Sequence, residues 1–271
     1  MTSQAAAQPF DTSVPHPARV YAYWLGGKDH YPADKEAADQ VIQRRPQVVA
    51  GARANRAFLA RVVRFLTAEC GIRQFLDIGA GLPAPDNTHD VAQDVSPQCR
   101  VVCVDNDPVV MAYARALLTS GGEGVCGYVE ADLRDTDTIL TQAAETLDLT
   151  QPVAVLMLAV LHLVPDRDDP AMIVKTLASA LTPGSYLAIS HVTADFAPRE
   201  VAAAVDAYNG LAPVPITPRA HAQVLGLFGG LPLLEPSVVP LTDWRPASPL
   251  TQRQPCDLYA GVAHIPGEAG P

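Results

Sequence analysis

The chain has 271 residues, of which 48% are hydrophobic, and its 19 basic and 29 acidic residues give a formal net charge of −10. This length and apolar content are sufficient for the core of one large domain or two small ones. An acidic surface repels the phosphates of nucleic acids and of anionic lipids, so we expect neither nucleic acid nor membrane as the principal partner.

The cysteines and the N-terminal residues indicate a cellular compartment. The five cysteines show no C-x-x-C spacing and no His neighbours at ligand spacing, so we expect neither a structural metal site nor a disulfide framework. The first ten residues lack the basic and apolar regions of a secretory signal, and no apolar run reaches the length of a membrane span. We therefore expect a cytoplasmic protein.

The N-terminal part is predicted to differ from the rest of the chain. Residues 1–13 are small and polar, as in a disordered tail. Residues 14–52 combine aromatic side chains, a Gly26-Gly27 break and a helix-prone run, which predicts a helical extension. Apolar residues at helical spacing predict a long helix over 53–70.

From residue 74 onwards, short apolar runs alternate with helical patterns, which is typical of repeated βαβ units. The fourth and fifth apolar runs are continuous, which predicts strands buried on both faces of a parallel sheet. The expected strands cover residues 74–78, 100–104, 125–130, 153–158 and 186–191. The expected helices between them cover residues 86–93, 108–118, 136–146 and 170–181.

The alternation ends after the fifth strand. Helical patterns over 198–208 and 217–228 are followed by strand patterns over 233–241 and 258–265, with no helical pattern between these two strands. Strands joined without a crossover helix pair antiparallel. Five parallel strands with an antiparallel pair at one edge predict a doubly wound, Rossmann-like α/β sheet of seven strands, the class I S-adenosylmethionine (SAM) methyltransferase arrangement.

A candidate nucleoside site lies at the ends of the first two strands. The turn after the first strand reads Asp77-x-Gly79-x-Gly81, and Asp105 follows the second strand. Glycines at such a turn let the backbone approach a ligand, and an acidic residue at the next strand end can accept hydrogen bonds from ribose hydroxyls. Leu82 follows in place of a tight glycine turn for a pyrophosphate. The pattern favours SAM over a nicotinamide cofactor; a turn without ligand and a helix-capping role for Asp105 are the alternatives.

The ends of the third and fourth strands supply further candidates. We expect the carboxylate of Asp132 to accept a proton from the amino group of adenine, while the backbone N–H of Leu133 serves a ring nitrogen. The turn after the fourth strand begins at Ala159 and contains His162. His162 could act as a general base because imidazole titrates near neutrality. A histidine anchored to the backbone is the alternative.

With these motifs, the chain resembles the S-adenosyl methyltransferase family. The resemblance implies a class I methyltransferase domain over 53–271, SAM as the cofactor and a SAM-dependent methyltransferase activity, and we expect a small-molecule acceptor. A non-catalytic SAM-binding sensor or regulatory protein is the alternative. The matching segments cover residues 18–29, 52–59, 75–83, 104–110, 131–134, 160–162 and 244–246.

The extension over 14–52 is interpreted as a lid over the cofactor. Lys28 supplies a cation for the carboxylate of the methionine moiety, and Tyr21, Tyr23 or Trp24 offers an aromatic face for the sulfonium. The alternative is that the aromatic side chains only attach an extra helix to the sheet. His162 is the catalytic candidate. The predicted cofactor-binding residues are Tyr23, Lys28, Asp77, Gly79, Gly81, Asp105, Asn106, Asp132, Leu133 and Ala159.

Overall fold

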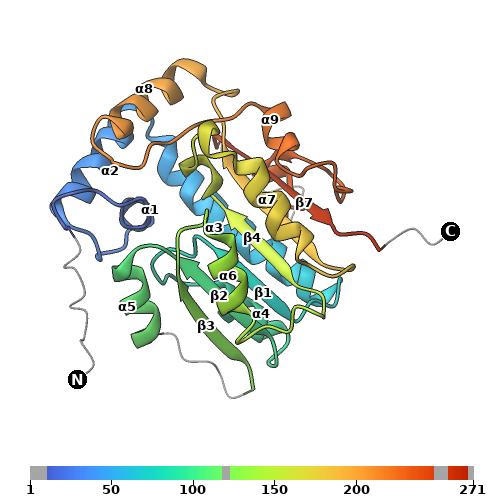
Figure 1. Cartoon of the computed structure of the whole chain (residues 1–271). Coiled ribbons are helices and arrows are strands. Elements are labelled where there is room, and N and C mark those ends of the chain that lie inside the picture. The colour runs from blue at the N-terminus through green and yellow to red at the C-terminus, as the bar shows by residue number, and fades with distance from the viewer. Residues whose placement is uncertain (1–10, 118–122, 247–255, 268–271) are drawn as a thin grey trace, which may run out of the picture.

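The computed structural model describes residues 11–117, 123–246 and 256–267. Their strands form one seven-stranded sheet in the order β3-β2-β1-β4-β5-β7-β6 (Figure 1). The first five strands pair in parallel, and β7 is antiparallel to both β5 and β6. This confirms the predicted fold class. The strands are β1 (Gln74–Ile78), β2 (Arg100–Asp105), β3 (Val125–Glu130), β4 (Ala154–Leu158), β5 (Tyr186–Val192), β6 (Val239–Pro240) and β7 (Leu258–His264).

The five parallel strands lie within one residue of their predicted bounds, but β6 is shorter than the predicted strand over 233–241. Within residues 233–241, Val239 and Pro240 pair with β7 as a ladder, and Leu233 adds one isolated bridge to it. Proline has no N–H to donate to a ladder, and Pro236 interrupts the segment. The predicted antiparallel pairing is correct, whereas the predicted strand length is wrong.

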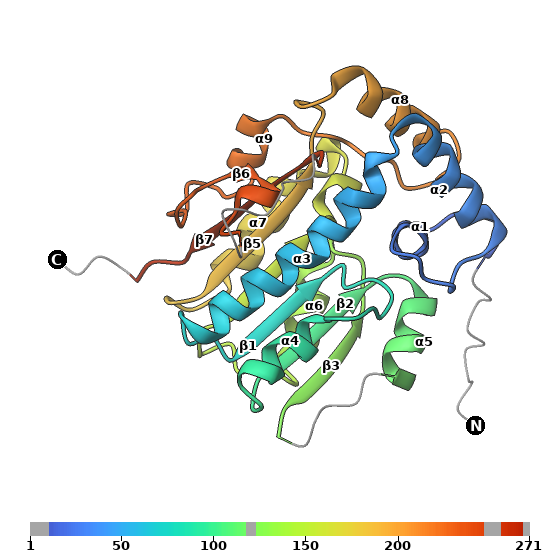
Figure 2. The same ribbon diagram turned by 180° about the vertical axis from the view of Figure 1, so that it is seen from behind.

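Helices cover both faces of the sheet. Figure 2 shows α3 and α4 on one face, and Figure 1 shows α6 and α7 on the other. The helices are α1 (Pro17–Trp24), α2 (Pro32–Arg44), α3 (Gln47–Ala68), α4 (Thr88–Val95), α5 (Pro108–Leu117), α6 (Thr136–Ala143), α7 (Pro170–Ser179), α8 (Pro198–Asn209) and α9 (His221–Gly226), with 3₁₀ turns η1 (Leu161–Leu163), η2 (Asp166–Asp168) and η3 (Leu241–Asp243).

Each central strand contributes to two cores because successive strand residues point to opposite faces. In β1, Leu76 and Ile78 pack with the α6 and α7 side, while Phe75 packs with the α3 side. All residues of β4 are buried, as its continuous apolar pattern predicts. The α3 core contains the fully buried Trp244, whose ring contacts Phe58 edge-on at 5.4 Å between centroids.

Three helices begin at residues other than those predicted. α4 begins at Thr88 rather than 86, and tertiary contacts explain the other two. α3 begins at Gln47 rather than 53, because its first turn packs through Val48 into a small core between α1, α2 and α8. α9 begins at His221 rather than 217. The backbone N–H groups of Thr217 and Arg219 instead donate hydrogen bonds to the carbonyls of His162 and Val192, which hold this segment in a non-helical path. The proposed boundary at 52/53 therefore falls inside α3.

The N-terminal extension lies at the carboxyl end of the parallel strands. In both views α1, α2 and α8 gather at this end of the sheet (Figures 1 and 2). Val20, Val41 and Tyr208, from three different helices, are buried together there. Residues 1–10 of the predicted disordered tail lie outside the described residues. Among the helices that the structure describes, none is both long and apolar enough to cross a membrane.

Candidate active site

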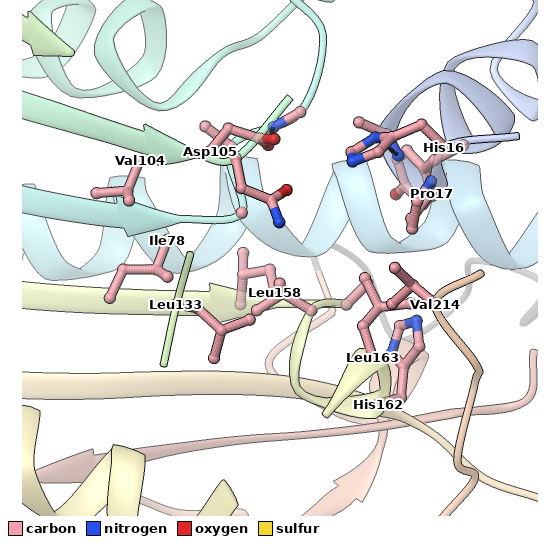
Figure 3. Close-up of a pocket in the computed structure, with 18 of the residues that line it drawn as sticks. His16, Pro17, Ile78, Val104, Asp105, Leu133, Leu158, His162, Leu163 and Val214 are labelled. Atoms are coloured by element: carbon pink, nitrogen blue, oxygen red, sulfur yellow. Dashed lines mark hydrogen bonds between the residues drawn. The ribbon is translucent and has the colours of Figure 1, made fainter. Parts of the chain in front are cut away.

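A cavity lies where β1, β2, β3 and β4 end, and it brings most of the predicted site residues together. Figure 3 shows Asp105 and Leu133 on one side, His16 at the start of α1 facing them, and His162 in the turn after β4. The predicted residues that line the cavity are Asp77, Gly79, Gly81, Asp105, Asn106, Asp132, Leu133, Ala159 and His162.

The turn after β1 depends on its two glycines. Both have positive φ, +78° at Gly79 and +70° at Gly81, a region that other L-residues enter only with strain. The N–H of Gly79 donates to the carbonyl of Val104 at 2.8 Å, and the N–H of Gly81 donates to Oδ2 of Asp105 at 2.9 Å. These bonds hold the turn against the end of β2, so the backbone itself forms part of the cavity wall.

Gly79→Ala is expected to be more damaging than Gly81→Ala. A Cβ at Gly79 would lie 2.6 Å from Cγ2 of Val160, whereas a Cβ at Gly81 meets nothing within 4 Å. Both substitutions carry a backbone cost of about 1–2 kcal/mol, but only the first also displaces the turn after β4. Urea unfolding and SAM titration of the two variants measure the difference. Equal losses in stability and affinity would contradict the assigned clash.

Asp105 is buried, with 7% of its surface exposed, and it organises the neighbouring loop. Its Oδ1 accepts from the N–H of Asp107 at 3.0 Å, while Oδ2 holds Gly81. Oδ1 of Asp107 in turn accepts from the N–H of Val109 at 2.9 Å and caps α5, so the capping role belongs to Asp107. Burial raises the pKa of Asp105, and its two backbone hydrogen bonds oppose that rise.

Asp132 and Leu133 form the wall at the end of β3. Oδ1 of Asp132 accepts from the backbone N–H of Arg134 at 2.9 Å, and Oδ2 accepts from the Arg134 guanidinium at 2.8 Å. The side-chain amide of Asn106 lies 3.5 Å from the same carboxylate. Leu133 lies beside Ile78 and Leu158 in the cavity (Figure 3). The wall therefore combines an apolar surface with a carboxylate that Arg134 holds in place.

Tyr23 and Lys28 do not line the cavity, contrary to the prediction. The hydroxyl of Tyr23 donates to Asp39 at 2.9 Å, and its ring packs edge-on against His30. Lys28 is exposed in the loop between α1 and α2. On α1 the cavity-facing aromatic residues are Tyr21 and Trp24, which are three positions apart and so share one helix face.

A buried ionic cluster, which the sequence did not indicate, attaches the extension to the loop after β2. Nε of Arg19 lies 3.3 Å from Asp107 and 3.5 Å from Asp34, and Nδ1 of His16 lies 3.1 Å from Asp107. Arg19, Asp34 and Asp107 are all buried. Nothing in the sequence indicated these contacts, because they depend on how α1 docks beside the loop after β2.

His162 is buried, and its environment keeps the ring neutral. Burial lowers the pKa of His162 well below its usual value, and His191 and Arg219 add to that shift. Its backbone carbonyl accepts from the N–H of Thr217. Nδ1 of the ring has no hydrogen-bond partner among the described residues. The side chain is therefore available to a molecule in the cavity.

His191 supports this turn without reaching the cavity. A nitrogen of the Arg219 guanidinium lies 2.9 Å from Nε2 of His191, and Nδ1 lies 2.7 Å from the carbonyl of Val192. Because Arg219 can only donate, Nε2 is the acceptor and Nδ1 carries the proton. Arg219 also bonds to Asp166 and to the carbonyls of Leu161 and Val164, so it connects β5 to the His162 turn.

The free energy of unfolding is expected to fall as the pH drops from about 6.5 to about 4. Burial lowers the pKa of His191 to about 4, whereas an unfolded histidine titrates near 6.5. Within this window the unfolded chain binds the proton and the folded chain does not, so acid favours unfolding. Urea unfolding at several pH values measures the slope, which His191→Gln should make shallower. An unchanged slope in that variant would contradict the assignment.

The glycine turn and the carboxylate at the end of β2 fit a phosphate-free adenosyl ligand. The helix after the turn begins only at Thr88, and the side chain of Leu82 is buried against Val109 and Met111. A dinucleotide fingerprint instead opens its helix at the third glycine to receive a pyrophosphate. Strand order and site together define a class I SAM-dependent methyltransferase.

Comparisons with known proteins agree with this class. The chain matches the S-adenosyl methyltransferase family over residues 3–266 and belongs to it. It is similar to the crystal structure of a DUF574 family protein from Streptomyces avermitilis MA-4680, with 44% identity, a TM-score of 0.90, and coverage of 94% of this chain and 99% of that chain. A protein from Thermobifida fusca YX described as a candidate methyltransferase shares 35% identity, with a TM-score of 0.87 and coverage of 95% and 97%.

A more distant structure shares the fold alone. The mitomycin 7-O-methyltransferase MmcR has 19% identity and a TM-score of 0.52, with coverage of 93% of this chain and 74% of that chain. No curated protein matches the sequence. Fold and family therefore establish a SAM-dependent methyltransferase, and the residues of the cavity must indicate the acceptor.

Proposed function

We propose that the enzyme methylates a small molecule that binds beside His162. The observation that carries this proposal is the extent of the cavity, which is lined at one end by Asp105 and at the other by His162 (Figure 3). Residues of α1 and of the segment after α8 line the space between them, including Trp24 and Val214. A concave site of this kind suits a small acceptor, and the net charge of −10 disfavours a nucleic acid.

In this proposal the strand ends hold the cofactor. Asp105 accepts hydrogen bonds from the sugar hydroxyls. Asp132 and the backbone N–H of Leu133 bind the adenine. The backbone at Gly79 and Gly81 contacts the remaining part of SAM. SAM supplies a methyl group on positively charged sulfur, so the driving force comes with the cofactor. The protein then has to position the acceptor and exclude water, which by itself can contribute several kcal/mol.

His162 is proposed as the group that receives a proton from the acceptor. A neutral imidazole with a free nitrogen can accept a proton from a hydroxyl, and burial keeps His162 neutral at physiological pH. The imidazole also has no hydrogen-bond partner at Nδ1 within the described part of the chain. A non-catalytic SAM sensor is not favoured, because the family and the related structures are methyltransferases.

Two measurements on the purified chain test this function. Calorimetric titration with SAM, S-adenosylhomocysteine and NAD should give binding of the first two and none of NAD. Incubation with SAM and a pool of small metabolites should form S-adenosylhomocysteine, and removal of the pool should stop it. Tight binding of SAM without turnover against any pool would instead favour the sensor.

A further inference from the structure

A second cavity adjoins the one that holds the candidate cofactor residues. It lies among α1, α2, α3, α8 and the end of β5, on the extension side of the sheet. Neither Asp105 nor the glycine turn lines it, so it is distinct from the adenosyl end of the first cavity. The two cavities meet at seven common residues: Tyr21, Trp24, Asn55, Ala159, His162, Tyr208 and Ile216.

The walls of the second cavity are mainly apolar. Tyr21 and Trp24 supply aromatic surface from α1, and aliphatic side chains come from α2, α3, α8, β5, β7 and two loops. A concave, mainly apolar wall with few polar groups is the usual form of a small-molecule site. The aliphatic lining residues are Val41, Val48, Ala52, Ala159, Val192, Val201, Ala204, Val205, Ile216 and Leu258.

The charged groups in this wall neutralise each other. Arg45 and Asp257 are the basic and the acidic side chain that line the cavity in the described part of the chain. Nε and Nη2 of Arg45 donate to the two carboxylate oxygens of Asp257 at 2.7 and 3.0 Å. This bidentate pair satisfies both groups, so neither is available to hold an ionic ligand.

Two polar atoms at the boundary between the cavities lack a partner within the described chain. They are Nδ1 of His162 and the hydroxyl of Tyr208, and both side chains are more than nine-tenths buried. Buried polar atoms without hydrogen bonds are costly and rare in native proteins. A ligand hydroxyl at this boundary could donate to the imidazole nitrogen and accept from the phenol.

We infer that the second cavity is the acceptor subsite and that the acceptor is an uncharged, mainly apolar molecule with a hydroxyl group. The apolar walls would hold its body, and the hydroxyl would lie at the boundary beside His162. This inference rests on the proposed function, since it identifies the substrate class of the same enzyme.

Calorimetry with three naphthalene probes tests the inference on enzyme saturated with S-adenosylhomocysteine. The probes are 2-naphthol, its methyl ether 2-methoxynaphthalene, and the anion 2-naphthoate, which share one ring system. 2-Naphthol should bind, the ether severalfold more weakly because it cannot donate a hydrogen bond, and the anion at least tenfold more weakly. No binding of 2-naphthol, or equal or tighter binding of the anion, would overturn the inference.

The substitution Val205→Phe tests whether 2-naphthol binds in the second cavity. Val205 lines the second cavity but not the first, so a phenylalanine there should lower the affinity for 2-naphthol at least tenfold and leave that for S-adenosylhomocysteine unchanged. Val95→Phe is the matched control, because Val95 is 38% exposed on α4 and lines neither cavity. Unchanged 2-naphthol affinity in folded Val205→Phe would overturn the assignment.

The outcomes separate the inference from the function on which it rests. If the wild-type chain binds S-adenosylhomocysteine but fails the probe comparison, the acceptor class is wrong and the methyltransferase stands. If it binds neither SAM nor S-adenosylhomocysteine, the proposed function fails and the inference fails with it. If the Val205→Phe variant does not fold, the comparison of the three probes on the wild-type chain still tests the acceptor class.

Discussion

Replacing Asp105 with alanine is expected to weaken SAM binding by about 1–3 kcal/mol, which corresponds to a loss of roughly 5- to 150-fold in affinity. The carboxylate lines the cavity at the end of β2, where we propose that the ribose binds, and it is buried with little access to water. The same carboxylate holds the N–H groups of Gly81 and Asp107. Its removal therefore loosens the turn after β1 as well as the contact to the sugar.

Calorimetry and thermal unfolding of the free protein separate these two effects. Asp105→Asn keeps the size of the side chain and one acceptor oxygen, so it should fold better than the alanine variant and still bind SAM more weakly than the wild type. Asp94→Ala is the control, since Asp94 is an exposed acid on α4 outside the cavity. SAM affinity equal to that of the wild type in either Asp105 variant would remove Asp105 from the cofactor site.

Replacing Arg19 with alanine is expected to destabilise the fold by about 3–5 kcal/mol, the usual cost of removing one partner from a buried ion pair. Nε of Arg19 faces the carboxylates of Asp34 and Asp107, and all three side chains are at least 95% buried. Without the guanidinium, two carboxylates remain close together in a poorly solvated place. Urea unfolding measures the loss.

The matched control for this prediction is Arg53→Ala, because Arg53 is exposed on α3. Arg53→Ala should change the free energy of unfolding by less than about 0.5 kcal/mol. A double variant, Arg19→Ala with Asp34→Asn, should recover part of the lost stability because it removes one of the two uncompensated charges. A loss below about 1 kcal/mol for Arg19→Ala would show that the cluster contributes little.

The same cluster gives the lid interpretation of residues 14–52 a physical basis, although the lid remains a proposal. Asp107 follows directly on the loop that holds Asp105, and it is also the residue that His16 and Arg19 contact. A ligand that orders this loop would thereby favour docking of α1. SAM affinity should therefore also fall in Arg19→Ala, whereas an extension that merely adds helix to the sheet would affect stability alone.

Patterns of local sequence were sufficient for most of the fold. The apolar runs and their spacing located the parallel strands, since burial on two faces requires a continuous apolar run. The absence of a helical pattern between the last two strands was sufficient for their antiparallel pairing. Strand length in β6 was predicted wrongly, because a run of apolar residues does not reveal how Pro236 interrupts the ladder.

The candidate cofactor residues at strand ends could be named from the sequence for a related reason. In a parallel sheet the carboxyl ends of all strands lie at one edge. Residues such as Gly79, Asp105 and Asp132 therefore come together whatever conformations the loops adopt. Tyr23 and Lys28 belong to no strand, and their prediction as cavity residues had no such constraint. The helix face that α1 presents is set by docking, and it presents Tyr21 and Trp24.

The sequence by itself thus determined the class of fold, the kind of cofactor and the strand ends that surround it, because these follow from short-range periodicity and from topology. Only the tertiary structure decided where the extension lies, how Arg19 meets Asp107, and that an apolar cavity with a neutralised Arg45–Asp257 pair adjoins His162. Those features join residues up to 212 positions apart. Contacts of that range depend on packing between whole elements, which no local pattern of side chains specifies.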